Sequence, residues 1–376
     1  MIMRKKALLA CLLILTVTLS GCSSLILRDS DVNARQTVMI INGDHITKQS
    51  FLNTYNYNLQ SEQYYAQLMA QFGVSDGSVD ESSVLQTTVE NIISGTVIAQ
   101  KAKELGLDSF TEEEKADLDA RAQEEYAQQL ETVKTDYLAG SSLDDEALEK
   151  AAAGYLASAG YTVENIRSSL QSSDVLDRLR SYIVSPVQVT DADLESALAE
   201  KIAADQSKYA ESPNALNTAL SGSTTVYYTP AGYRLIRVYS ISRQTDDDSS
   251  ETQSEDPLSL AESLQAALSE GQNADVSAEY KEYRITTGST LPDADTAAAA
   301  MALESVGQAT EILETDKEYR IAVYMEDIPE KTLTLAEVYD DLHAEVLSSA
   351  QDSAYNAAVQ EWIDKAEVES YLERLK

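Results

Sequence analysis

Histidine is nearly absent from this sequence, which holds only His45 and His343 among its 376 residues. Neither has a second histidine near it in sequence, so the chain offers no histidine cluster for a metal ion and no recognisable serine–histidine pair of the kind that a hydrolase uses. We interpret His45 as part of a structural turn and His343 as a surface or interface residue of a late helix. The sequence predicts no metal site and no other cofactor.

Cysteine is equally scarce, and both cysteines lie close to the N-terminus. Cys11 belongs to an apolar run over 7–18, which follows a short basic opening and is shorter than the roughly 20 residues that cross a hydrocarbon core. This combination predicts an export signal over 1–21. Once that segment is removed, Cys22 is the last cysteine, so the exported part can form no internal disulfide and depends on packing for its stability.

The export signal ends in the tetrapeptide Leu19-Ser20-Gly21-Cys22, which resembles the lipobox of bacterial lipoproteins. In that family the chain is cut before the cysteine, whose sulfur carries a diacylglycerol. An ordinary signal peptide with an incidental cysteine is the alternative. The resemblance implies that Cys22 is the lipid attachment residue. It also implies that two acyl chains hold the protein on the outer face of the bacterial cell membrane, since each buried methylene contributes about 0.8 kcal/mol.

Positive charge is the third scarcity, with 28 Lys and Arg against 63 Asp and Glu and a formal net charge of −35. Such a surface repels phosphate backbones and anionic lipid headgroups, which excludes nucleic acid as a partner. The acidic residues are spread over many predicted helices and therefore indicate solvation rather than a site. The acidic, serine-rich stretch 243–257 lacks the alternation and the closing glutamate of a calcium loop, so we interpret it as a solvated loop.

Helical signals dominate the first half of the exported chain. A linker over 22–37 leads to the β-branched run 37–41, which predicts a strand, and Asn42-Gly43-Asp44 predicts a turn. Thr47 is placed to cap the following helix. Apolar residues then recur at helical spacing up to Gly106, which can take a left-handed cap conformation. Further capping signals predict helices over about 111–137, 143–158, 162–182 and 190–209.

Four separated motifs follow one another in this region. They read INGDHITKQSF from residue 41, KAKELGLDSFTEEE from 101, GYTVENIRSSLQ from 160 and VQVTDADLESAL from 187. Over about 38–210 they resemble, in content and order, the N-terminal domain of SurA- and PrsA-type extracytoplasmic foldases. The resemblance implies a SurA- or trigger-factor-like helical chaperone domain, to which we assign 38–220. It also places His45 at a variable position of a structural start motif.

The composition changes after residue 220. We predict a buried strand over 233–241, an amphipathic helix over 258–272 and a final strand over 318–328. This is the order of elements in a parvulin domain. The segment YYTPAGYRLIRVYSI is similar to the first strand of the parvulin domains in such foldases, and VGQATEIL…KEYRIAVYMED is similar to their ending. The similarity implies a parvulin-like α+β domain over 221–330.

This parvulin pattern is incomplete where parvulins carry their histidines, one in the first strand and one near the last. Alignment places Val238 and Arg320 at these positions, and the segment 225–329 contains no His, Cys or Phe. The family's Gly-Gly-Asp-Leu-Gly loop is also missing. An isomerase must lower a barrier of about 18–20 kcal/mol by holding a twisted amide in an apolar pocket with placed hydrogen-bonding groups. We therefore predict no catalytic residues and interpret Val238 and Arg320 as a vestigial groove.

A long helix predicted over 335–366 follows the parvulin-like segment, with Thr334 and Glu337 as its capping box. In the foldases that the sequence resembles, a C-terminal helix packs back onto the N-terminal helical domain. The resemblance thus implies that 331–376 packs on the chaperone domain and that 221–330 is inserted between its two parts. The expected fold class is mainly α with an α+β insert.

Tyrosine is abundant where the other aromatic residues are not, with 21 Tyr against 3 Phe and 1 Trp. A tyrosine joins an apolar ring to a polar tip, which suits weak and unspecific binding of unfolded chains. The tyrosines of the segment 55–68 either form such a surface or simply pack against neighbouring helices.

These features favour a membrane-anchored extracytoplasmic chaperone or foldase that binds unfolded or partly folded exported polypeptides and whose parvulin-like domain is inactive. An active peptidyl-prolyl isomerase of the PrsA and parvulin type is the alternative. A non-enzymatic binding or structural lipoprotein is a second one, although solute binders usually show alternating βα units, which 38–210 lacks. The sequence leaves open whether the protein is a monomer or a homodimer.

Overall fold

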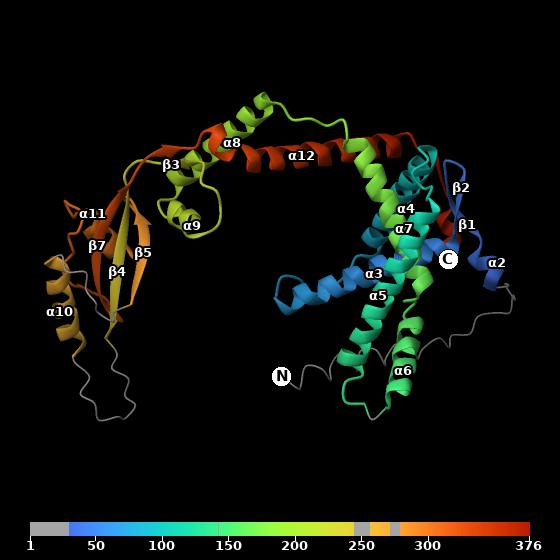
Figure 1. Cartoon of the computed structure of the whole chain (residues 1–376), viewed down its shortest axis with the longest axis horizontal. Helices are drawn as coiled ribbons and strands as arrows, with labels where there is room; N and C mark the ends of the chain where they lie inside the picture. Colours follow the sequence, from blue (N-terminus) through green and yellow to red (C-terminus); the bar gives the residue numbers. More distant parts are fainter. Residues whose placement is uncertain (1–29, 142, 244–255, 271–278) are drawn as a thin grey trace. The chain divides into compact units, whose positions relative to one another are not determined.

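The computed structural model describes residues 30–141, 143–243, 256–270 and 279–376 (Figure 1). The predicted export signal, Cys22 and most of the acidic stretch lie outside these residues. The chain divides into two compact units: the first extends to Ser185 and resumes at Tyr355, and the second is Pro186–Ala354. The long helix α12 (Leu335–Asp364) contributes residues to both units.

The first unit opens with α2 (Ser30–Ala34) and a β-hairpin of β1 (Thr37–Ile41) and β2 (Asp44–Thr47). Asn42 and Gly43 form the hairpin turn with φ angles of 50° and 88°, as a tight turn requires. Because this turn takes only two residues, Asp44 already pairs with Ile41. Our interpretation of His45 as a turn residue is therefore wrong, since it lies in β2 opposite Ile40.

Helices make up most of the first unit. The Thr47 hydroxyl accepts a hydrogen bond from the Ser50 N–H at 3.2 Å and so caps the first long helix, as predicted. Thr111 and Thr162 cap later helices, and Thr111 forms a complete capping box with Glu114. The helices are α3 (Lys48–Gln71), α4 (Glu81–Glu104), α5 (Glu112–Thr132), the π-helical turn η1 (Val133–Tyr137), α6 (Asp145–Ser158) and α7 (Val163–Val184).

The beginning and the end of the described chain meet in the core of the first unit. β9 (Val368–Ser370) pairs antiparallel with β1, which gives a sheet of order β2-β1-β9. Met39 and Phe51 are fully buried there, and Trp362 of α12 and Leu372 of the short 3-10 helix η2 (Leu372–Leu375) pack against this cluster. β9 was not expected from the sequence.

Lys48 fastens the last residues to this core. Its buried side chain donates hydrogen bonds from Nζ to the backbone carbonyl of Arg374 at 2.8 Å and to that of Lys376 at 3.4 Å. The Arg374 guanidinium in turn donates to the carbonyl of Thr37 at 2.7 Å. A buried ammonium group without acceptors is costly, so the burial of Lys48 depends on the position of this C-terminal segment.

The helical part of the second unit consists of α8 (Asp191–Glu211), α9 (Ala215–Ser221) and the first part of α12. Leu194 and Leu198 of α8 pack against Val338 and Leu342 of α12. Residues 191–220, which we assigned from the sequence to the helical domain, thus belong to the same compact unit as the segment that follows them.

Two short strands, β3 (Tyr228–Thr229) and β8 (Lys331–Thr332), pair antiparallel between the helical part of this unit and its larger sheet. The carboxylate of Asp205 on α8 accepts hydrogen bonds from the N–H groups of Tyr227 and Tyr228 at 2.7 and 3.1 Å. The chain leading into the sheet is therefore held against α8.

The sheet of the second unit is antiparallel with the strand order β5-β4-β7-β6. α11 (Ala294–Met301) packs on one face against Ile236 and Val238, and α10 (Pro257–Ser269) packs on the other against Tyr239 and Ile321. The strands are β4 (Tyr233–Ser242), β5 (Tyr280–Ile285), β6 (Leu313–Glu314) and β7 (Glu318–Ile328).

The predicted fold class is confirmed, because a mainly helical chain carries an α+β portion in its second half. Strands 233–242 and 318–328 and helix 257–269 fall where the sequence placed them. None of the helices in the described parts of the chain is both long enough and apolar enough to pass through a membrane.

Candidate functional site

Val238, one of the two predicted groove residues, lies in a packed interior. It is 3% exposed and pairs with Ala322 on β7. Its neighbours in the core include Ala297 and Ala300 of α11. The side chain thus contacts apolar groups on the face of the sheet that α11 covers.

Arg320, the other predicted groove residue, forms two ion pairs. Its Nε lies 2.9 Å from a carboxylate oxygen of Glu318, and its Nη1 contacts the carboxylate of Asp293. Burial alone would raise the pKa of Asp293, but hydrogen bonds from Thr296 and the charge of Arg320 outweigh burial and lower it. Asp293 also caps α11 by accepting a hydrogen bond from the Thr296 N–H at 2.8 Å. Arg320 therefore fastens the start of α11 to β7.

The other end of α11 is held by Arg234 of β4. Its guanidinium donates to the backbone carbonyls of Met301 and Leu303 at 3.0 and 2.8 Å and lies over the ring of Tyr324, 4.3 Å from the centroid. α11 is thus fixed at both ends over the sheet face that contains Val238. The sequence did not reveal Arg234, because its acceptors are backbone carbonyls.

Val238 and Arg320 lie on the same face of the sheet, since Val238 pairs with Ala322 and Ser240 pairs with Arg320. The two positions are diagonal neighbours across β4 and β7. One of them is an apolar side chain, and the other is a permanent cation between two carboxylates. Neither side chain can both donate and accept a proton near neutral pH.

Both histidines lie outside this part of the chain. His45 is exposed, and its Nδ1 is 3.1 Å from the Thr37 hydroxyl. His343 stacks on the ring of Tyr339 one helical turn earlier, with 5.8 Å between the centroids. Within the described ranges, no three His, Cys, Asp or Glu side chains are grouped so that they could hold a metal ion.

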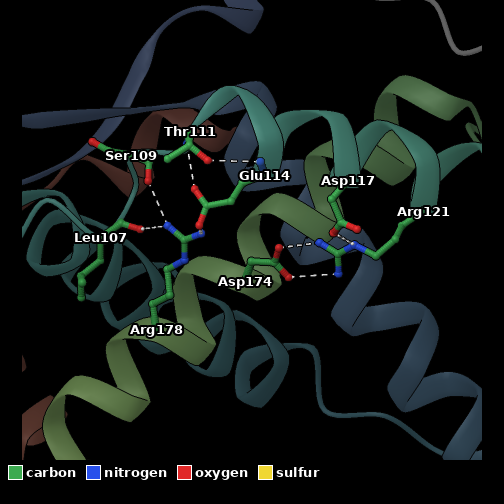
Figure 2. Close-up of polar contacts among 8 residues, drawn as sticks. All are labelled: Leu107, Ser109, Thr111, Glu114, Asp117, Arg121, Asp174 and Arg178. Carbon is green, nitrogen blue, oxygen red and sulfur yellow. Dashed lines mark hydrogen bonds and ion pairs between the residues drawn. The ribbon is translucent and has the colours of Figure 1, made fainter.

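In the first unit, a polar network joins the predicted motif KELGLDSFTEEE to α7 (Figure 2). Arg178 of α7 donates to the Glu114 carboxylate at 2.7 Å and to the Ser109 carbonyl at 2.9 Å, and its guanidinium lies 4.1 Å from the centroid of the Phe110 ring. Hydrogen bonds from the backbone N–H and the hydroxyl of Thr111 lower the pKa of Glu114, and the charge of Arg178 lowers it further. One arginine therefore binds the cap of α5 and the turn before it.

Two further arginine pairs connect α5 to α7. Arg121 on α5 contacts Asp174 on α7 at 2.5 Å, as Figure 2 shows, and Arg167 on α7 contacts Asp119 on α5. Arg167 belongs to the motif GYTVENIRSSLQ, so this motif contributes one of the contacts between α5 and α7. Such partly exposed ion pairs add little stability one by one, but together they fix which turn of α5 faces which turn of α7.

Exposed aromatic side chains gather along α3 and at the turn after it. Tyr57 is 74% exposed, Tyr64 70% and Phe72 73%. Tyr65 is exposed as well, and we call these four aromatic residues the α3 aromatic surface. Tyr55 instead packs against the core around Phe51. Within the segment 55–68, Tyr55 is therefore a packing residue, whereas Tyr57, Tyr64 and Tyr65 are exposed.

The comparisons with known proteins agree with the motifs. Residues 2–123 match the family model described as SurA-like N-terminal domain. The foldase protein PrsA of Clostridium botulinum strain Langeland is 23% identical over 214 residues, which cover 56% of this chain and 56% of the relative, and PrsA of strain Kyoto matches equally. The chain thus spans about half the length of the curated relatives it matches. These matches confirm the SurA- and PrsA-type resemblance of the sequence.

Solved structures of SurA-like chaperones and of PrsA foldases are also similar to this chain. A SurA-like chaperone of Campylobacter jejuni is 11% identical with a TM-score of 0.32, and the match covers 89% of this chain and 98% of that one. The foldase PrsA of Streptococcus pneumoniae is 14% identical with a TM-score of 0.21, covering 86% and 89% of the two chains.

Proposed function

Because the chain carries a SurA-like N-terminal domain, we propose that it is an extracytoplasmic chaperone or foldase that binds unfolded or partly folded exported polypeptides. The names of its relatives support this proposal, since they are foldases of the PrsA type. The predicted export signal supports a place outside the cytoplasm.

The observation that carries the proposal is the α3 aromatic surface. Exposed aromatic side chains gain free energy by burial against a partner, and the tyrosine hydroxyl keeps them soluble without one. Lys48 and Glu62 are the charged residues of α3, and Lys48 is buried, so little charge interrupts this surface. Unfolded polypeptides expose apolar side chains of many kinds, and such a surface can contact them without selecting a sequence.

A light-scattering assay tests this proposal. The purified exported part should suppress the aggregation of a thermally unfolded model protein. Replacing Tyr57, Tyr64 and Tyr65 together with serine should reduce the suppression severalfold. The matched control replaces Tyr137, Tyr155 and Tyr182, three exposed tyrosines away from α3, and should suppress aggregation as the parent does. A parent protein without effect on aggregation would remove the proposal.

The proposal includes an anchor and an inactive domain. Cys22 carries the lipid that holds the protein on the outer face of the bacterial cell membrane, as the motif Leu19-Ser20-Gly21-Cys22 suggests. The domain over 221–330 has a parvulin-like order of elements but no isomerase activity. The burial of Val238, the ion pairs of Arg320 and the lack of histidine in 225–329 support this assignment.

A further inference from the structure

α4 and α7 of the first unit enclose a groove of about 880 Å³. Its apolar lining comes from Ile98, Val175 and Leu176, and Leu176 leaves 45% of its surface exposed. The rest of the lining includes small side chains. Among them are Gly95 on α4 and Ser172 on α7. The volume is in the range of about 300–1,000 Å³ that is usual for binding clefts in proteins.

The polar lining of this α4–α7 groove is almost free of net charge. Asn91 and Gln171 contribute amide groups, and the charged side chains Lys103 and Asp108 have opposite signs. This balance contrasts with the chain as a whole, whose formal net charge is −35. The side chains that line the groove therefore offer no unpaired excess of charge to a bound ligand.

An extended polypeptide segment has the complementary chemistry. Its backbone offers uncharged amide donors and carbonyl acceptors, which match the amides of Asn91 and Gln171 and the hydroxyl groups of the groove. Its apolar side chains can be buried against Ile98, Val175 and Leu176, where they gain about 25 cal/mol for each Å² of apolar surface removed from water.

We infer that the α4–α7 groove binds a short, extended, uncharged and apolar segment of an unfolded polypeptide. The inference rests on the proposed chaperone function and gives it a defined site, separate from the α3 aromatic surface. The aromatic surface contacts clients broadly, whereas the groove selects segments without charge.

Gly95 provides a direct test of the groove. A Cβ added at Gly95 meets no atom within 4 Å, and the same holds at Gly154 on α6, which does not line the groove. Gly95→Leu should fill the groove and raise the helix propensity of α4, so it should not unfold the protein. Gly154→Leu is the matched control, because it makes the same chemical change in a helix of the same unit.

A second pair of variants tests the apolar lining of the groove. Leu176→Ser removes an exposed apolar side chain of the lining, and Leu143→Ser removes one of nearly equal exposure, 46%, outside it. Circular dichroism and thermal unfolding of all four variants identify any that fail to fold. If one pair of variant and control is unstable, the other pair can still show whether the groove binds the peptide.

Fluorescence anisotropy with a labelled, uncharged peptide of alternating apolar and small polar residues measures binding. We expect Gly95→Leu and Leu176→Ser to weaken it by about tenfold or more and the two controls to leave it within about twofold. The same peptide with aspartate or lysine in place of its apolar residues should bind about tenfold more weakly than the neutral one. Raising the salt concentration should leave the affinity for the neutral peptide unchanged, because exposed charges do not contribute to it.

Unchanged peptide binding by both groove variants, in a protein that still suppresses aggregation, would overturn the groove assignment and leave the chaperone proposal standing. A steep loss of affinity with salt or a preference for the lysine peptide would also overturn it. A parent protein that neither binds the peptide nor suppresses aggregation would instead remove the chaperone proposal itself.

Discussion

Arg178 of α7 lies 2.7 Å from the carboxylate of Glu114, the residue that closes the capping box of α5. The same guanidinium donates to the carbonyl of Ser109 and stacks on Phe110. The Arg178 side chain thus connects the turn between α4 and α5 to α7. The side chains of Phe110 and Glu114 thus both contact one arginine that lies far from them in sequence.

Arg178→Ala should lower the thermal midpoint of the first unit by several degrees. The substitution removes the hydrogen bonds to the Glu114 carboxylate and to the Ser109 carbonyl. It also removes the contact of the guanidinium with the Phe110 ring. Arg178→Lys should recover only part of the loss, because an ammonium group cannot make the forked contacts of a guanidinium. Thermal unfolding followed by circular dichroism measures both variants, and equal midpoints for Lys and Ala would show that charge contributes nothing here.

Glu337 makes the stability of the second unit depend on pH. A hydrogen bond from the Thr334 N–H, then contacts with Lys331 and the Thr334 hydroxyl, lower the pKa of Glu337 to about 2. Since the folded-state pKa is below the ordinary value of 4.5, the ionised carboxylate stabilises the native state above pH 4.5. This contribution is lost as the pH falls from 4.5 towards 2.

The matched variant for this effect is Glu337→Gln, which keeps the shape but not the charge. At pH 7 the parent should unfold at a higher temperature than the variant. The difference between their thermal midpoints should shrink steadily below pH 4.5 and vanish near pH 2. A difference that stays constant over this range would mean that the charge of Glu337 does not stabilise the helix start.

Removing residues 367–376 should destabilise the first unit by several kcal/mol. The truncation deletes β9 and the apolar contacts of Leu372 and Leu375, and it leaves the buried ammonium group of Lys48 without its two carbonyl acceptors. An uncompensated buried charge alone costs about 3–5 kcal/mol. Lys48→Met should therefore recover part of the stability in the truncated chain, while in the full chain it should lower stability, because it removes both hydrogen bonds to the C-terminal segment. Chemical denaturation measures the free energy of unfolding of the full and the truncated chain, each with and without Lys48→Met. If Lys48→Met recovers no stability in the truncated chain, the buried charge of Lys48 is not a cause of the destabilisation.

Cys22→Ser should release the protein from membranes or leave its export signal uncut. The sulfur of Cys22 is the proposed attachment point of the lipid, and serine cannot accept a thioether-linked diacylglycerol. Cell fractionation and gel mobility compare the variant with the parent. A variant that fractionates and migrates like the parent would exclude the lipid anchor.

The purified exported part should not accelerate the cis-to-trans isomerisation of a proline peptide. The time constant should stay near its uncatalysed value of about tens to hundreds of seconds. Val238 can neither donate nor accept a proton, and Arg320 can only donate. A protease-coupled isomerisation assay measures the rate. A large acceleration that mutations within 225–329 abolish would establish the active isomerase instead.

Local chemistry allowed much of the fold to be predicted. Thr47, Thr111 and Thr162 start helices because their hydroxyls accept bonds from N–H groups three residues on, and such pairs are visible in the sequence. At Thr334 the prediction was half right. Glu337 accepts from the Thr334 N–H, but the Thr334 hydroxyl donates to the same carboxylate instead of accepting from the backbone.

Contacts between distant segments could not be predicted in this way. β9 is a short exposed strand of three residues without an alternating pattern, and only its pairing with β1 makes it a strand. The contacts of Arg178 could not be predicted either, because its partners include backbone carbonyls that any residue could supply. Alignment with a known family singled out Arg320, but the ion pair that it forms with Asp293 depends on the position of α11 and could not be predicted from the sequence.

The pairing of β1 with β9 sets the order in which this protein can finish folding during its synthesis. A polypeptide is made with its N-terminal part first, so β1 is available long before β9, one of its two neighbours in the sheet. The second unit is one continuous stretch, Pro186–Ala354, and all of it must emerge before β9 does. Until then Met39 and Phe51 lack part of their cover, and the nascent protein exposes the kind of apolar segment that it is proposed to protect in others.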